Sequence, residues 1–143
     1  MSKARYLLDV NVLIALTDEL HAHHRLVNDW IKTPGLQWGV CAFTEAGFLR
    51  VTTNPRAGAF TLETAGAILA DLPNRPGYQY WAIAMGWSAL AAPFSERIFG
   101  HQQITDAFLL GLAVREGGVL VTMDKAVRSM AGARCSQHVL VLE

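Results

Sequence analysis

The chain has 143 residues, of which 52% are hydrophobic and 17% are charged, and its formal net charge is +0. This length and apolar content predict one domain, residues 1–143, with enough material for a hydrophobic core. The balanced charge excludes a protein that binds nucleic acid through a strongly basic surface, so any RNA contact has to be local.

The spacing of apolar residues and the positions of Gly and Pro predict an alternation of strands and helices. In chain order we expect a strand over 6–8, helices over 12–16 and 22–31, a strand over 37–40, helices over 43–51 and 62–72, a strand-like stretch over 78–83, helices over 87–99 and 106–115, a strand over 119–122, a helix over 125–131 and a strand over 139–142. Thr61 and Thr105 are the expected N-caps of the helices that follow them. This alternation predicts an α/β fold, a three-layer α/β/α sandwich with a mostly parallel central sheet.

Four acidic residues occupy places where a parallel sheet gathers its functional groups. Asp9 and Asp124 each come after a predicted strand, and Glu45 and Asp106 each open a predicted helix. The carboxyl ends of parallel strands and the helix starts beside them converge at one edge of the sheet. We therefore expect these four carboxylates to form one site.

Each of these carboxylates alone has an ordinary explanation, because acidic residues are favoured in the first turn of a helix and in loops after strands. Four carboxylates brought together repel one another unless a cation neutralises their charge. A hard divalent cation, Mg²⁺ or Mn²⁺, is therefore expected at the cluster.

Four segments carry a resemblance to a known family: LLDVNVLIAL, TEAGFLRVTTNP, ITDAFLLGLAV and LVTMDKAV. Their order and setting resemble those of PIN domains over nearly the whole chain, and most of all those of VapC-type toxins of bacterial toxin–antitoxin pairs. The resemblance implies a metal-dependent endoribonuclease that acts on structured RNA such as transfer RNA and is inhibited by an antitoxin. The site residues that it implies are Asp9, Glu45, Asp106 and Asp124, with Asn11 as the polar companion of the first and Thr122 as the hydroxyl residue before the last.

The chemistry expected of such a cluster is hydrolysis by water that a bound cation activates, with in-line attack on phosphorus. Thr105 is expected to support the site from its place beside Asp106. Arg50 and Lys125 lie near the motif segments and are candidate contacts for RNA phosphates. A mean hydropathy of +0.24 favours a homodimer and a groove for the antitoxin.

Cys41 and Cys135 lack the spacing of a metal or redox motif and are expected to be free thiols in a reducing compartment. We recognise no signal peptide, and the most apolar window, 78–94, falls short of a transmembrane span. A cytoplasmic protein without membrane contact is therefore expected. The three histidines near position 22 adjoin acidic residues and are expected on a solvated surface instead of at a zinc site.

Three alternatives are weighed against a nuclease. A haloacid-dehalogenase-like phosphatase needs a second aspartate two positions after the first, where this chain has Asn11. A Rossmann nucleotide-binding module needs a G-x-G-x-x-G motif after the first strand, and the sequence lacks it. A PIN-like module that binds RNA or a partner without turnover would gain by losing four charges that repel phosphate.

Overall fold

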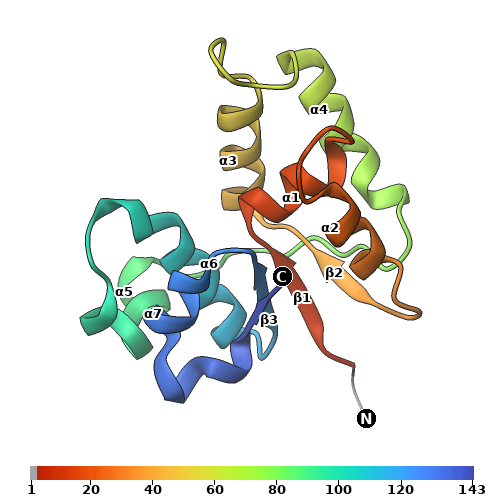
Figure 1. Ribbon diagram of the computed structural model, residues 1–143. Helices are drawn as coiled ribbons and strands as arrows, with labels where there is room; N and C mark the ends of the chain where they lie inside the picture. Colours follow the sequence, from red (N-terminus) through yellow and green to blue (C-terminus); the bar gives the residue numbers. More distant parts are fainter. Residues whose placement is uncertain (1–2) are drawn as a thin grey trace.

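The computed structural model describes residues 3–143 and contains, in this range, one parallel β-sheet of four strands in the order β2-β1-β3-β4. The strands are β1 (Arg5–Leu8), β2 (Gln37–Gly39), β3 (Val119–Thr122) and β4 (Val139–Val141). All three neighbouring pairs are parallel. The carboxyl ends of the strands therefore lie at one edge of the sheet, which faces upward in Figure 1.

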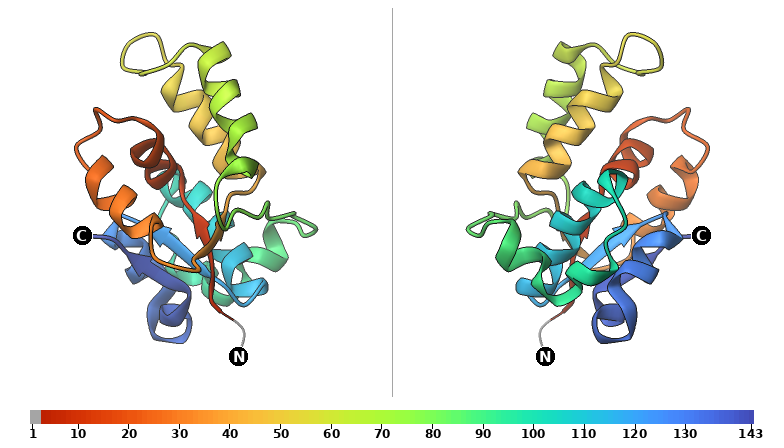
Figure 2. Two further views of the ribbon diagram at one scale, coloured as in Figure 1. Left: turned by 90° about the vertical axis from the view of Figure 1, so that its right-hand side faces the viewer. Right: turned by 90° about the vertical axis from the view of Figure 1, so that its left-hand side faces the viewer.

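Helices cover both faces of this sheet, as Figures 1 and 2 show. One hydrophobic core joins a face of the sheet to α1 (Val10–Thr17), α2 (His24–Ile31), α3 (Ala42–Thr52) and α4 (Leu62–Asp71). A second core joins the opposite face to α5 (Trp87–Ala91), α6 (Ile104–Arg115) and α7 (Lys125–Cys135). The 3-10 helices are η1 (Leu72–Asn74), η2 (Ala92–Arg97), η3 (His101–Gln103) and η4 (Ser136–His138). The predicted three-layer α/β/α sandwich is confirmed.

Alternate side chains of the central strands enter the two cores. In β1, Leu7 packs into the core with α5 to α7, and Leu8 packs into the core with α1 to α4. Leu120 and Val121 of β3 divide in the same way, and all four side chains are fully buried. Successive side chains of a strand point to opposite faces, so a strand covered on both faces needs a continuous apolar run.

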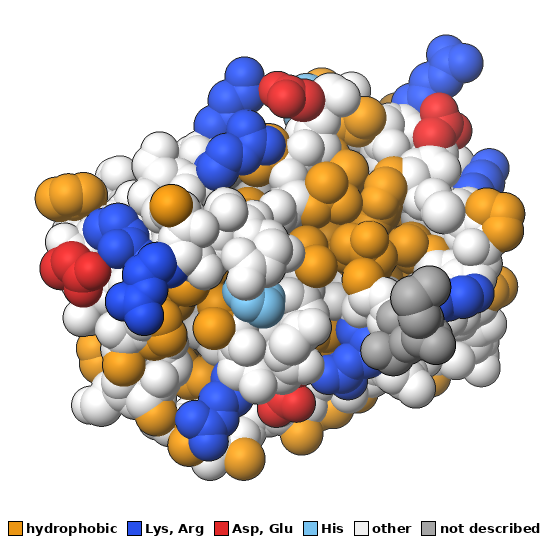
Figure 3. Space-filling model, turned by 90° about the horizontal axis from the view of Figure 1, so that it is seen from below, with side chains coloured by type: hydrophobic (Ala, Val, Ile, Leu, Met, Phe, Trp, Pro, Cys, Tyr) orange, Lys and Arg blue, Asp and Glu red, His pale blue; other side chains and the backbone are white. Residues whose placement is uncertain are grey.

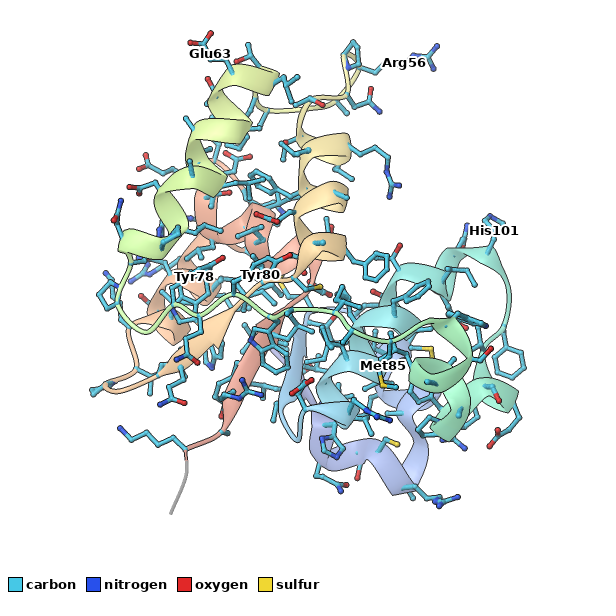
Figure 4. All side chains as sticks on the ribbon, turned by 180° about the vertical axis from the view of Figure 1, so that it is seen from behind. Arg56, Glu63, Tyr78, Tyr80, Met85 and His101 are labelled. Atoms are coloured by element: carbon cyan, nitrogen blue, oxygen red, sulfur yellow. The ribbon has the colours of Figure 1, made fainter. Side chains whose placement is uncertain are left out.

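The chain passes from one helical layer to the other along an extended segment before α5. Figure 4 shows Tyr78 and Met85 along this crossing segment, which passes in front of the sheet in that view. The segment follows the edge of β2 through two parallel bridges, Trp38 with Tyr78 and Cys41 with Trp81. The strand expected over 78–83 is therefore reduced to these two bridges.

Gly39 permits the close approach of the crossing segment to β2. A Cβ at position 39 would overlap the carbonyl oxygen of Gln79 and lie 2.9 Å from Cδ1 of Trp81. The backbone amide of Gln79 donates to the carbonyl oxygen of Trp38 at 2.8 Å, which fixes the two segments at this separation. A side chain at Gly39 would therefore separate the crossing segment from the sheet.

One predicted helix cap is confirmed and one is wrong. The Thr61 hydroxyl accepts a hydrogen bond from the amide of Thr64 at 3.1 Å and caps α4. Thr105, in contrast, lies inside the first turn of α6, whose N-cap is Gln103. The η3 turn leads directly into α6, so the helix starts before Thr105 and leaves no cap position there.

Two helix bounds also differ from expectation. The helix expected over 87–99 is divided into α5 and η2. Helix α7 continues past 131 to Cys135, across Gly132, whose φ of +66° interrupts the helical backbone.

Within residues 3–143, no helix combines the length and the apolar character needed to cross a bilayer. Cys41 and Cys135 are buried free thiols, as predicted.

Candidate active site

The connections of the sheet change direction between β1 and β3, its two central strands. From β1 the chain leads through α1 and α2 to β2 on one side, and it later returns through α5 and α6 to β3 on the other side. In open parallel sheets, ligands bind beside the carboxyl ends of the strands at such a switch point. Asp9 follows β1 and Asp124 lies two residues beyond β3, so both acidic residues stand there.

Asp9 is fixed at the end of β1. Its backbone amide donates to the carbonyl oxygen of Val121 at 3.1 Å, and its carboxylate caps α1 by accepting from the amide of Val12 at 2.9 Å. Only 4% of the residue is exposed. Burial raises the pKa of Asp9 to about 6; hydrogen bonding with Thr122 and Val12 opposes this rise, and the negative charge of Asp124 adds to it.

Asp106 lies in the first turn of α6 and shares this environment. Its pKa is raised to about 7, first by burial and then by the negative charges of Asp9 and Asp124. The ion pairs formed within residues 3–143 involve other acids, namely Glu96, Glu116 and Glu143. The described part of the chain therefore supplies no Lys or Arg ion pair to neutralise this group of carboxylates.

Thr122 connects two of the acidic residues. Its hydroxyl accepts a hydrogen bond from the backbone amide of Asp124 at 3.1 Å, and its hydrogen bonding with Asp9 lowers the pKa of that carboxyl. Thr122 is fully buried, whereas Asp124 is exposed and caps α7 by accepting from the amide of Ala126 at 2.9 Å. The structure thus places the predicted supporting residue Thr122 in contact with the acidic group.

Glu45 lies on α3, and its negative charge acts on a tyrosine outside the group formed by Asp9, Asp106 and Asp124. It is half-buried in the first turn of the helix. The pKa of Tyr78, on the crossing segment, is raised by burial and next by the negative charge of Glu45. In contrast, the negative charge of Asp124 raises the pKa of Asp9, and the negative charges of Asp9 and Asp124 raise the pKa of Asp106.

The carboxylates suit a divalent cation by their charge and donor chemistry. Two carboxyl groups with raised pKa values, without an ion pair in the described chain, are the hard oxygen donors that Mg²⁺ and Mn²⁺ prefer. Among residues 3–143, no three His, Cys, Asp or Glu side chains lie close enough to hold one ion together. Mg²⁺ keeps several waters and commonly uses one or two carboxylates, so Asp9 and Asp106 fit this requirement.

The other predicted site residues lie around this group. Asn11 is exposed in the first turn of α1, and hydrogen bonding from its backbone amide lowers the pKa of Asp9. Arg50 is exposed in the last turn of α3. Lys125 pairs with Glu143 at 3.2 Å, with both side chains mostly exposed. Such an exposed pair is weak, so Lys125 stays available to a phosphate.

Thr44 is a site residue that the sequence analysis missed. Its buried hydroxyl donates to the carbonyl oxygen of Leu8 at 2.9 Å. This bond ties the helix that carries Glu45 to the strand that ends at Asp9. The position of Thr44 next to an acidic residue was a weak signal, and a hydrogen bond across 36 residues has no sequence signature.

Two hollows differ in their relation to the acidic group. A hollow of about 190 Å³ is lined directly by Asp106 and Asp124. A larger hollow of about 710 Å³ lies at the amino end of β2 and has no carboxylate among its described lining residues. The molecule seen from below shows a hydrophobic patch among Lys and Arg side chains (Figure 3). The smaller hollow, at the carboxyl edge of the sheet, therefore belongs to the site.

The fold and the site together define an α/β protein with an acidic site at the carboxyl edge of a parallel sheet. This arrangement suits the hydrolysis of phosphate esters, because a divalent cation at such a site neutralises both the carboxylates and the substrate. A nuclease and a phosphatase both meet this description.

Comparison with known proteins decides between these classes. The family model of the PIN domain matches residues 6–133. Ribonuclease VapC38 of Mycobacterium tuberculosis is 39% identical over 131 residues, which cover 90% of this chain and 91% of that protein. Ribonuclease VapC44 of the same species is 35% identical over 143 residues, covering 96% and 99%. A toxin-antitoxin complex from Klebsiella pneumoniae shares the fold, with a TM-score of 0.64 and 16% identity over 95% of this chain and 96% of that chain.

This chain belongs to the PIN-domain family, and within it to the VapC group. The resemblance inferred from the sequence is confirmed. Family membership leaves the phosphatase alternative without support.

Proposed function

We propose that this protein is the ribonuclease toxin of a toxin–antitoxin pair and that it cleaves RNA internally with Mg²⁺ or Mn²⁺ as cofactor. Curated relatives that match nearly its whole length are named ribonucleases. A structural neighbour is a toxin-antitoxin complex. The proposed metal dependence and residue roles rest on the burial and the shared charge environment of Asp9 and Asp106.

The observation that carries the proposal is the state of Asp9 and Asp106. Both carboxyl groups have pKa values raised well above the ordinary 3.8, to about 6 and about 7. Burial that raises the pKa of a carboxyl group lowers the free energy of unfolding at neutral pH, so these groups do not stabilise the fold there. Groups of this kind are typical of a functional site, and here a divalent cation is the partner that would favour their charged form.

When bound, Mg²⁺ or Mn²⁺ would withdraw charge from a phosphate and lower the pKa of water. Asp9 and Asp106 would hold the cation, with Asp124 and Glu45 completing the acidic site. The amide of Val12 and the side chain of Thr122 fix the orientation of Asp9. The cation would also reduce the repulsion between these carboxylates and an RNA phosphate, so it should strengthen RNA binding at this site.

The test is cleavage of a labelled pool of total transfer RNA by the purified protein with Mg²⁺, with Mn²⁺ and with EDTA. Asp9→Asn is compared with Asp29→Asn, which changes an exposed acid on α2. We expect metal-dependent cutting that Asp9→Asn abolishes and Asp29→Asn keeps, with 5′-phosphate and 3′-hydroxyl ends. Cutting in EDTA that leaves 2′,3′-cyclic phosphate ends would contradict the proposal.

The second candidate is a PIN module that binds RNA or a partner without cutting it. The observation that favours it is the lack, in residues 3–143, of three converging metal-ligating side chains. RNA binding without cleavage under any metal would support this candidate over the first.

We further propose an antitoxin as the protein partner and a homodimer as the assembled state. Exposed apolar side chains, among them Leu20 at 95% and Tyr80 at 52%, are available for such contacts. RNA as substrate and two free cysteines are consistent with action in the cytoplasm. Light scattering of the purified protein, alone and with an antitoxin encoded beside it, measures both assemblies.

A further inference from the structure

The hollow beside Asp106 and Asp124 has a second wall that the reaction does not explain. This wall is formed by Phe99, Gln102 and Gln103, which lie on η3 and on the residues just before it. Figure 4 shows His101, from the same turn, at the outside of the molecule. The carboxylates and the second wall therefore face one shared space of about 190 Å³.

The Phe99 side chain is exposed, and hydrogen bonding fixes its backbone. The residue is 80% exposed, which is unusual for a large apolar side chain and leaves its ring without burial. Its backbone amide donates to Oε1 of Gln103, with a distance of 2.6 Å. Gly100 follows with φ of +97°, a left-handed value that lets the chain turn into η3. The exposed ring is thus part of an ordered turn.

Apart from Asp106 and Asp124, the lining is uncharged, and it combines amide groups with a smaller apolar surface that suits a flat, polar ligand group. Val127 and Met130 supply an apolar surface, and they are almost fully buried. The described lining contains no Lys, Arg or His, so this space does not attract a phosphate by itself. Its volume is below the range of about 300–1,000 Å³ typical of sites for drug-sized ligands, and it suits one ring system.

The two glutamines supply hydrogen-bonding groups at the second wall of this hollow. Because Oε1 of Gln103 accepts from the Phe99 amide, the NH₂ group of Gln103 is the part left to donate. Gln102 is exposed at the same wall and offers both a donor and an acceptor. An apolar surface, an exposed aromatic ring and amide groups are the elements by which proteins bind an unpaired base.

We propose that this hollow is a nucleobase subsite, in which Phe99 stacks on one base of the RNA strand beside the phosphodiester at Asp106 and Asp124. Gln102 and Gln103 hydrogen-bond to the edge of that base and give the enzyme a base preference next to the cut. The base must be unpaired, because its face and its edge are both used. This inference rests on the proposed ribonuclease function, and it adds the subsite that selects the substrate.

The first experiment measures binding without cutting. Fluorescence anisotropy gives Kd values for labelled single-stranded oligo(A), oligo(C) and oligo(U) with the full chain in EDTA. We expect Phe99→Ala to raise the Kd for the preferred base by about five- to hundredfold and Phe99→Trp to retain binding. The matched control is Leu62→Ala. It shortens an exposed apolar side chain on α4, away from the hollow, and should change no Kd. Equal Kd values for Phe99→Ala and wild type with all three RNAs would overturn the proposal.

The second experiment sequences the cut sites in a randomised single-stranded RNA with Mg²⁺ or Mn²⁺. We expect a base preference beside the cut that Phe99→Ala and Gln102→Ala weaken, with KM more affected than kcat. Loss of base-specific binding in Phe99→Ala without cleavage by any variant would support the subsite and reject the ribonuclease function. Cleavage with an unchanged preference and an unchanged KM would reject the subsite and support the ribonuclease function.

Discussion

Gly47 of α3 lies so close to Val10 of α1 that a Cβ at position 47 would stand 2.5 Å from Cγ2 of Val10. Val10 follows Asp9 directly, and Gly47 lies two residues after Glu45. This tight contact between α1 and α3 therefore lies near Asp9 and Glu45 along both helices. A glycine at this position sets the distance from which α3 presents Glu45.

Gly47→Ala is expected to lower the free energy of unfolding by about 1–2 kcal/mol, because the cost of overpacking exceeds the gain in helix propensity. The control is Gly66→Ala on α4, where a Cβ would meet nothing within 4 Å. Gly66→Ala should stabilise the protein by about 0.5–1 kcal/mol. Urea denaturation measures both changes. If Gly47→Ala stabilised the protein as much as Gly66→Ala, the close contact between Gly47 and Val10 would not limit the size of the residue at position 47.

Thr44→Val tests how the peptide unit before Asp9 is held. The Asp9 amide donates to Val121 on one side, and the Leu8 carbonyl oxygen accepts from Thr44 on the other. Removal of the Thr44 hydroxyl should cost about 1–2 kcal/mol of stability and weaken Mn²⁺ binding in calorimetry, with recovery in Thr44→Ser.

The control for this variant is Thr52→Val in the same helix. Thr52 is 2% exposed, and its hydroxyl donates to the carbonyl oxygen of Phe48 at 2.7 Å, within α3 itself. Thr52→Val should cost a similar stability and leave Mn²⁺ affinity unchanged. Equal losses of Mn²⁺ affinity in both variants would assign Thr44 a structural role alone.

The stability of the metal-free protein should fall as the pH rises. The folded-state pKa values of Asp9 and Asp106, about 6 and about 7, exceed the ordinary value of 3.8. Between about pH 4 and pH 7 the folded chain therefore binds protons that the unfolded chain has released, and the free energy of unfolding decreases with pH. Asp106→Asn should raise the stability at about pH 8 by roughly 1–2 kcal/mol and flatten the profile. Asp29→Asn should keep the wild-type slope, and an unchanged slope in Asp106→Asn would show that its carboxyl ionises normally.

Divalent cations should stabilise the folded chain most where these carboxyls are charged. At about pH 8, saturating Mg²⁺ should raise Tm by roughly 5–10 °C, and at about pH 5 by much less. Asp9→Asn should reduce the rise, whereas NaCl at equal ionic strength should not produce it. A rise in Tm that is the same at both pH values would place the cation elsewhere on the protein.

The strands and most helices could be predicted because their signals are local. An apolar run that stops at Asp9 or before Asp124 indicates a buried parallel strand and its carboxyl end together. The start of α6 at Ile104 could not be predicted, because the preceding η3 turn continues into the helix and Gln103 takes the cap position expected at Thr105. The residues of this turn carry no strong helix signal, so the sequence pattern places the helix start too late.

The finer arrangement of the site depends on tertiary packing that has no sequence period. The convergence of Glu45 with the other acids stays a prediction. Its charge effect on Tyr78 depends on the crossing segment, which was expected as a strand and forms only two isolated bridges beside β2. The hollow at Phe99 lies on irregular 3-10 turns, where apolar spacing gives no orientation. The mutual charge effects among Asp9, Asp106 and Asp124 agree with the predicted cluster, and the roles of these residues as ligands stay a prediction.

The ribosome synthesises two of the acidic residues before the crossing segment and two after it. Asp9 and Glu45 precede it, whereas Asp106 and Asp124 follow it, and β3 must pair with β1 before the two sets can meet. A nascent chain on the ribosome lacks this pairing until the last part of the domain has emerged. Asp9 and the two later aspartates can therefore come together only after β3 has been synthesised and has paired with β1.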